Sequence, residues 1–145
     1  MEIFIPLAKK IKEQALHYQI IITISKNQSK EAKLYCQKII QESLDSVIIN
    51  VGSVYLEDIP HLYQLTDGLL LPTLLESYSG TYIEALFYEK PIFTSYFDFT
   101  KTVCKEAAFY FDPFNMAMPL NISSKKGFNT LLVGIKKHSR KKQHS

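Results

Sequence analysis

The sequence predicts an α/β fold, a Rossmann-like three-layer α/β/α domain built on a parallel sheet. Short apolar runs rich in β-branched residues alternate along the chain with longer segments of helical period, which is typical of βαβ units. Each run is almost continuously apolar, as a strand covered on both faces must be. The composition agrees, because 46% of the 145 residues are hydrophobic and 12% are aromatic, as in globular domains.

Five strands are predicted, at residues 19–25, 46–51, 68–71, 91–95 and 107–111. Helices are expected at about residues 2–17, at 60–65, and from near Thr81 to Glu89. A further helix is predicted by apolar residues at helical spacing: Ala32, Cys36, Ile39, Ile40 and Leu44. Turn-forming residues dominate beyond about Asn115. We therefore expect residues 1–115 to form the domain and residues 116–145 an irregular, basic C-terminal tail.

The sequence does not support several classes of protein. Cys36 and Cys104 have no metal-ligand or redox spacing, the four histidines have no ligand spacing, and no Gly-rich phosphate loop is present. The sequence shows no signal peptide, and no apolar run approaches the roughly 20 residues of a membrane span. We expect a cytoplasmic protein without metal or cofactor.

Basic residues crowd the end of a chain whose net charge is only +3: Lys136, Lys137, Arg140, Lys141 and Lys142. Terminal segments are commonly solvated, so a solvated tail is the favoured interpretation, and no nucleic-acid partner is expected. The alternative is peripheral contact with anionic lipid at the inner face of the membrane.

Residues 70–90, LLPTLLESYSGTYIEALFYEK, carry the chemistry. They predict a strand, a polar loop and a helix, which places the loop at the carboxyl end of a parallel strand, where α/β sheets bind ligands. The free N–H groups of a helix beginning near Thr81 suit a diphosphate, and Gly80 permits close approach. Glu84 in the first turn suits a vicinal diol, and Glu76 in the loop suits hydroxyls at the other end of a ligand. The alternative is a capping box, Thr81-x-x-Glu84, which serves only the helix.

The segment ESYSGTYIE resembles the Glu-x7-Glu motif of retaining family-4 glycosyltransferases of the GT-B architecture. The resemblance continues on both sides, in Asp67, Pro72-Thr73, Glu84-Ala85, EKPIFTSYFDF and AAFYFDPFN. It covers about residues 47–115 and implies the C-terminal, donor-binding half of such an enzyme. The family's opening strand, whose loop supplies an Arg and a Lys to the diphosphate, is not recognised, nor is its N-terminal acceptor domain. We therefore expect a truncated half that lacks its first strand.

The resemblance also implies roles for individual residues. Glu76 would contact the donor sugar as the catalytic-site acid, and Glu84 would hold the ribose. The backbone of Ser79, Gly80 and Thr81 would bind the diphosphate or sugar. Val54 would line the nucleobase, the alternative being an ordinary residue at a strand end.

The implied function is retaining transfer from a nucleotide-activated sugar, linked to UDP, GDP or ADP, to a glycan or lipid acceptor. Surface polysaccharide or glycoconjugate synthesis is the expected setting, and no bound metal is required. A chain without the acceptor domain is expected to show no transferase activity alone. The main alternative is a non-catalytic α/β nucleotide-binding module, or a subunit that needs a separate N-terminal chain. A receiver-type regulatory domain is disfavoured, because Ile24 is followed by Ser25, Lys26 and Asn27 rather than by an acidic cluster.

Overall fold

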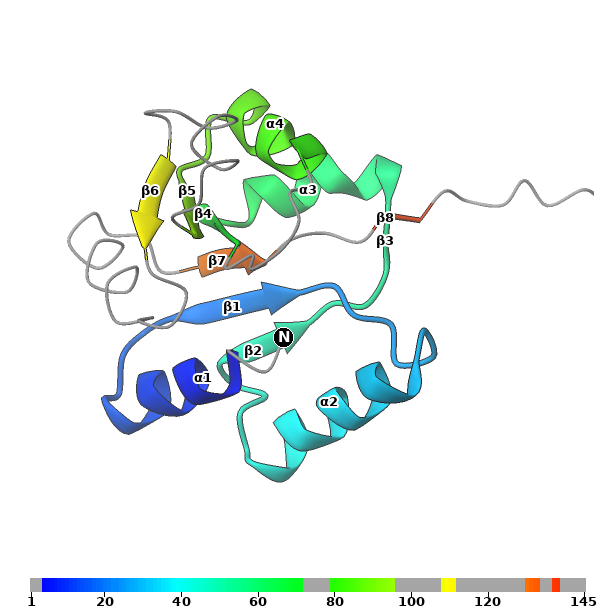
Figure 1. Cartoon of the computed structure of the whole chain (residues 1–145), viewed down its shortest axis with the longest axis vertical. Helices are drawn as coiled ribbons and strands as arrows, with labels where there is room; N and C mark the ends of the chain where they lie inside the picture. Colours follow the sequence, from blue (N-terminus) through cyan, green and yellow to red (C-terminus); the bar gives the residue numbers. More distant parts are fainter. Residues whose placement is uncertain (1–3, 72–78, 96–107, 112–129, 134–136, 139–145) are drawn as a thin grey trace, which may run out of the picture.

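The computed structural model describes residues 4–71, 79–95, 108–111, 130–133 and 137–138 (Figure 1). Its helices are α1 (Phe4–Glu13), α2 (Lys30–Gln41), a 3-10 turn η1 (Leu56–Asp58), α3 (Ile59–Gln64) and α4 (Ser79–Phe87). Its strands are β1 (Gln19–Ile22), β2 (Ile48–Asn50), β3 (Val54–Tyr55), β4 (Gly68–Leu71), β5 (Ile92–Ser95), β6 (Ala108–Phe111), β7 (Thr130–Val133) and β8 (Lys137–His138).

Six of the described strands form one sheet in the order β2-β1-β7-β4-β5-β6, and every neighbouring pair is parallel. The predicted α/β class with a parallel sheet is thus confirmed. All five predicted strands are present. Only residues 68–71 have the predicted bounds, and the other four strands are shorter than expected.

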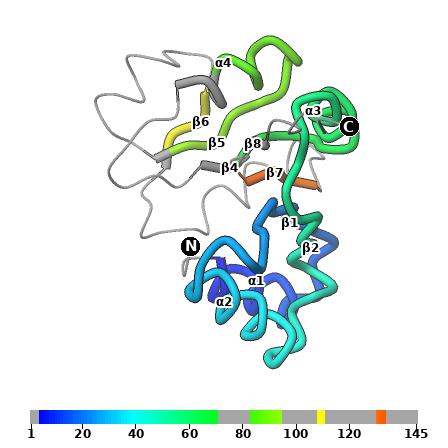
Figure 2. The backbone as a smooth tube through the Cα atoms, turned by 90° about the vertical axis from the view of Figure 1, so that its right-hand side faces the viewer, coloured from blue at the N-terminus to red at the C-terminus, as the bar shows by residue number. Residues whose placement is uncertain are grey.

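The sheet lies between two pairs of helices. Figures 1 and 2 show α1 and α2 on one face and α3 and α4 on the other. Alternate strand residues serve the two faces: Ile20, Ile22 and Leu131 pack in the core beside α1 and α2, whereas Ile21 and Leu132 pack in the core beside α3 and α4. This alternation follows from the two-residue period of a strand and explains why the runs are continuously apolar.

Side-chain interactions hold α1 and α2 on the face of the sheet that they cover. Ser29 caps α2, its hydroxyl accepting a hydrogen bond from the Ala32 N–H at 3.0 Å. Lys9 pairs with Glu42 at 2.9 Å and so ties α1 to the end of α2. The predicted apolar face of α2 is right for Ala32, Cys36 and Ile39, but wrong for Ile40, whose side chain is 61% exposed. Leu44 is buried beyond the end of the helix.

The expectation of irregular structure after residue 115 is wrong at β7. Thr130–Val133 is a central strand, paired with β1 on one side and β4 on the other. The backbones of Asp67 and Thr130 are joined by an N–H to carbonyl bond of 2.7 Å, and the Asp67 carboxylate accepts a second bond from the Thr130 N–H at 2.8 Å. The sheet therefore takes in residues on both sides of the predicted boundary at 115. The rest of residues 116–145 lies outside the described residues, apart from β8.

A strand from near the end of the chain takes the position in the sheet that an opening strand usually has, and the expectation of a missing first strand stays a prediction. In the common doubly wound sheet, the strand that comes first in the chain lies third in the sheet, beside the point where the strand order reverses. That third position is occupied here by β7, which comes from near the end of the chain. The described strands thus follow the doubly wound order, with β7 in the third position.

No helix within the described ranges is both long and apolar enough to cross a membrane.

Candidate functional site at the carboxyl edge of the sheet

The switch in strand order brings the carboxyl ends of β4 and β7 beside each other. The neighbouring strands β7 and β4 are parallel, with Leu70 opposite Val133, so both strands end at the same edge of the sheet. The strand order reverses between them, and open α/β sheets bind ligands outside the carboxyl ends of strands at such a point. The segment with the Glu-x7-Glu spacing leaves the sheet from β4, and the basic C-terminal segment leaves it from β7.

Helix α4 begins two residues earlier than predicted, at Ser79 rather than near Thr81. Thr81 therefore lies inside the helix, and the capping box Thr81-x-x-Glu84 is wrong, because an N-cap residue has non-helical backbone. Ser79, Gly80 and Thr81 are instead the first three residues of α4. Their N–H groups belong to the first turn, which has no intrahelical acceptors, and their predicted role in binding a diphosphate or sugar stays a prediction.

Glu84 is correspondingly in the second turn of α4, not the first. It lies five residues after Ser79, about 7.5 Å along the axis from the start of the helix. Glu84 is half-buried. The other predicted acid, Glu76, lies outside the described residues.

The Glu84 carboxylate is held by an aromatic residue that the sequence analysis missed. The Tyr63 hydroxyl, on α3, donates a hydrogen bond to Glu84 Oε2 at 3.5 Å. Tyr88, one turn after Glu84, stacks on the Tyr63 ring with centroids 4.8 Å apart and an interplanar angle of 21°. Burial raises the pKa of Tyr63 to about 12, and Tyr88 adds to the rise. The sequence offers only the weak signal of a tyrosine within an apolar helical run.

Val54, the predicted nucleobase contact, packs in the core beside α3 and α4 and is 7% exposed. That placement favours the alternative, an ordinary strand residue, for its side chain. Its backbone pairs with Lys137 in the two-stranded ladder of β3 and β8. The basic C-terminal segment thus begins beside β3, which follows the carboxyl end of β2.

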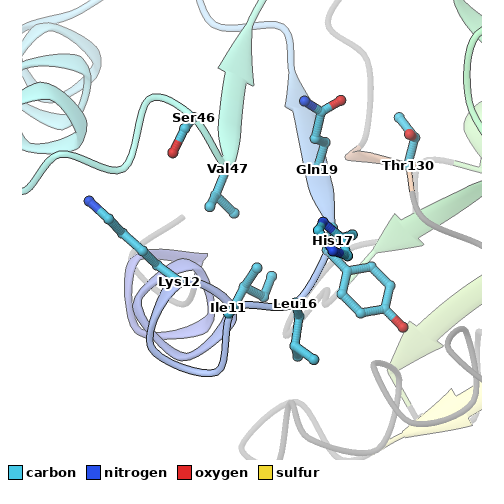
Figure 3. A pocket seen from close by; sticks show the side chains of 10 residues that line it. Ile11, Lys12, Leu16, His17, Gln19, Ser46, Val47 and Thr130 are labelled. Carbon is cyan, nitrogen blue, oxygen red and sulfur yellow. The ribbon is translucent and has the colours of Figure 1, made fainter.

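The opposite edge of the sheet carries an open hollow of about 460 Å³ (Figure 3). Lys12, His17 and Gln19 line it, together with Ser46 and Thr130, from α1 and the amino ends of β1, β2 and β7. Ligands in open α/β sheets bind at the carboxyl ends instead, so we do not place the site there. In the part of the chain that the structure describes, no three His, Cys, Asp or Glu side chains are grouped to hold a metal ion.

Comparison with known proteins gave no match: no family model matches the chain, and no curated protein or solved structure is significantly similar to it. The resemblance to family-4 glycosyltransferases therefore depends on the residues quoted above.

Proposed function

We propose that this chain is the donor-binding domain of a GT-B, family-4 type glycosyltransferase that takes a nucleotide-activated sugar. The observation that carries the proposal is the position of α4, which begins in the segment that follows β4 at the switch in strand order. A diphosphate suits this position, because the free N–H groups of a helix start bind anions. The resemblance of ESYSGTYIE to the Glu-x7-Glu motif lies in the same segment.

The segment that follows β7 also supports the binding of a diphosphate. A departing nucleoside diphosphate needs cationic or hydrogen-bonding groups that offset its charge. The loop after β7 leads in sequence to Lys136 and Lys137, and the Lys137 backbone is placed against β3. These lysines are our candidates for the charge that the family's opening loop supplies, because β7 occupies the position of an opening strand.

The two acids, Glu84 and Glu76, have separate proposed roles. Glu84 accepts hydrogen bonds from the two ribose hydroxyls, for which a carboxylate has enough lone pairs. Glu76 orients the donor sugar, as the family resemblance implies. Transfer to a glycan or lipid acceptor needs the reactants held about 3 to 3.5 Å apart, which in this architecture requires an acceptor-binding domain.

Isothermal titration calorimetry with UDP, GDP and ADP, each beside its nucleoside, tests the proposal. We expect one diphosphate to bind with a defined stoichiometry and its nucleoside to bind at least tenfold more weakly. A matching sugar nucleotide is expected to bind at the same site. If no nucleoside diphosphate binds, the proposed function is wrong.

A second measurement distinguishes an active donor domain from a non-catalytic nucleotide-binding module. An active donor domain is expected to bind a sugar nucleotide differently from the bare diphosphate, because Glu76 contacts the sugar. The variant Glu76→Gln is then expected to weaken only the sugar nucleotide. Equal binding of both ligands by both proteins would favour a module that recognises the nucleotide alone.

A further inference from the structure

Tyr63 and Glu84 come from different helices and meet on the face of the sheet covered by α3 and α4. Tyr63 is 1% exposed, and its hydroxyl donates to Glu84 Oε2 at 3.5 Å across 21 residues of sequence. At 3.5 Å the bond is longer than the roughly 2.5 to 3.0 Å of typical O–H···O bonds, so it is a weak restraint on the carboxylate. Glu84 remains half-buried, so the restrained side chain is partly exposed.

The Tyr63 ring is itself fixed. Tyr88, which directly follows α4, stacks on it, and Ile59 and Leu62 from α3 belong to the same core together with Leu69 of β4. A buried aromatic ring with few accessible rotamers makes its hydroxyl a stationary donor. Tyr88 directly follows the end of α4 and lies four residues after Glu84, and its N–H donates to the Glu84 carbonyl at 3.0 Å, so the ring that stacks on Tyr63 is tied to the helix that carries the acid.

We propose that Tyr63 is a positioning residue of the nucleotide site, acting through Glu84 on the vicinal diol of the ribose. The inference depends on the proposed function, since it assigns Glu84 to the ligand. A glutamate side chain loses much rotamer freedom when it binds. The bond from Tyr63 removes part of that freedom before the nucleotide arrives, which strengthens binding without a direct contact.

The hydroxyl keeps this role over the neutral pH range. Burial raises the pKa of Tyr63 to about 12, so the hydroxyl stays protonated and remains a donor. A carboxylate that accepts this bond keeps lone pairs with which it can accept two ribose hydroxyls.

The chain offers a matched control in Tyr35. Its side chain is also buried, at 8% exposed, but it lies on α2 in the other core, and its hydroxyl has no hydrogen-bond partner in the described parts of the chain. Tyr35→Phe therefore removes the same atom as Tyr63→Phe without touching Glu84.

The test is calorimetric titration of the whole chain with UDP, GDP and ADP, for Tyr63→Phe, Tyr35→Phe, Glu84→Gln, Glu84→Ala and the double variant Tyr63→Phe with Glu84→Ala, since alanine removes the acceptor of the Tyr63 hydroxyl. We expect Tyr63→Phe to weaken the binding nucleotide about fivefold to tenfold and Tyr35→Phe to leave it unchanged. In the Glu84→Ala background the Tyr63 substitution is expected to add less than twofold. Circular dichroism and thermal unfolding of each variant establish that the fold is kept.

Distinct outcomes overturn the inference. Unchanged affinity in Tyr63→Phe, with Glu84→Gln weakened, shows that Tyr63 does not position the acid, while the proposed function stands. An equal loss on both backgrounds shows that Tyr63 acts only on the structure. Absence of nucleotide binding by the unmodified chain overturns both this inference and the proposed function. If Tyr63→Phe fails to fold, Tyr88→Leu is the second variant, because it removes the stacked ring but keeps the Tyr63 hydroxyl. It must weaken nucleotide binding in the chain that has Glu84 and not in the chain that lacks Glu84. Any other result means that the inference is wrong.

Discussion

Leu70 of β4 lies directly opposite Val133 of β7 in the parallel sheet. Leu70 is one residue from the end of its strand and Val133 is the last residue of its own. The acidic segment that resembles a glycosyltransferase motif and the basic segment at the end of the chain therefore leave the sheet as neighbours. This juxtaposition joins residues more than sixty positions apart in sequence and is the basis of the predictions on charge.

Neutralising the lysines that follow β7 is expected to weaken nucleotide binding. The double variant Lys136→Gln with Lys137→Gln removes two cations from the segment that follows β7 in sequence. We expect at least a tenfold loss of affinity for the diphosphate at low salt and a smaller loss at high salt, because salt screens exposed charges. Calorimetry at a low and a high salt concentration measures the two losses of affinity.

Lys10→Gln with Lys38→Gln is the control for the same change in net charge. Both residues are exposed, and they lie in the last turns of α1 and α2. Equal effects of the two double variants would mean that net charge alone, not the segment after β7, attracts the nucleotide.

Asp67 is expected to be essential for holding β7 in the sheet. Its carboxylate accepts a hydrogen bond from the Thr130 N–H at 2.8 Å, and hydrogen bonds to charged groups contribute about 1.5 to 3 kcal/mol. Asp67→Ala should lower the free energy of unfolding by about that amount, measured by urea denaturation. Asp45→Ala, at an exposed position, is the control. A loss below about 0.5 kcal/mol would contradict the proposed anchor.

Gly68 at the start of β4 is expected to tolerate no side chain. A Cβ there would lie 3.1 Å from the Pro91 carbonyl oxygen and 3.4 Å from atoms of both Leu131 and Phe93. Overpacking of this kind typically costs about 1 to 3 kcal/mol. Gly68→Ala should therefore lower the urea midpoint clearly. An unchanged midpoint would show that β4, β5 and β7 are packed less closely than described.

The two buried tyrosines predict opposite effects on stability. Tyr63→Phe removes a hydroxyl that has a partner and should destabilise the fold by about 0.5 to 1.5 kcal/mol. Tyr35→Phe removes a hydroxyl without a partner in the described ranges and should be neutral or stabilising. Thermal unfolding at pH 7 compares them, and the reverse order would contradict the assigned hydrogen bond.

The same tyrosines predict the alkaline limit of stability. Burial raises the pKa of Tyr63 from 10.0 to about 12, and burial also raises the pKa of Tyr35 well above its usual range. The folded state thus holds these protons more tightly than the unfolded chain. Their contribution to stability is complete below pH 10 and is lost as the pH rises from 10 towards 12. Tyr63→Phe should make the fall in unfolding free energy above pH 10 less steep, and an unchanged slope would contradict the raised pKa.

Local patterns predict the strands because each one needs β-branched, apolar residues on both faces. They do not predict β7, since TLLV is short and follows turn formers, and its pairing with Asp67, Gly68 and β1 is a matter of long-range contacts. The start of α4 was misplaced because the Thr81-x-x-Glu84 pattern imitates a cap. The role of Tyr63 could not be predicted for the same physical reason as β7, because its hydrogen bond to Glu84 joins residues 21 positions apart in the sequence.

The affinity of Glu84→Gln for nucleoside diphosphates tests the central claim most directly. Glutamine keeps an acceptor for the Tyr63 hydroxyl and is a good helix former, so the fold should be retained. It loses the charge and the second acceptor oxygen that the ribose diol is proposed to use. We predict about a tenfold to hundredfold loss of affinity for the diphosphate that binds best, with thermal stability within a few degrees of the unmodified chain and with Glu13→Gln unaffected. Full affinity in Glu84→Gln, in a protein that still binds a nucleotide, would contradict the assignment of Glu84 to the donor site.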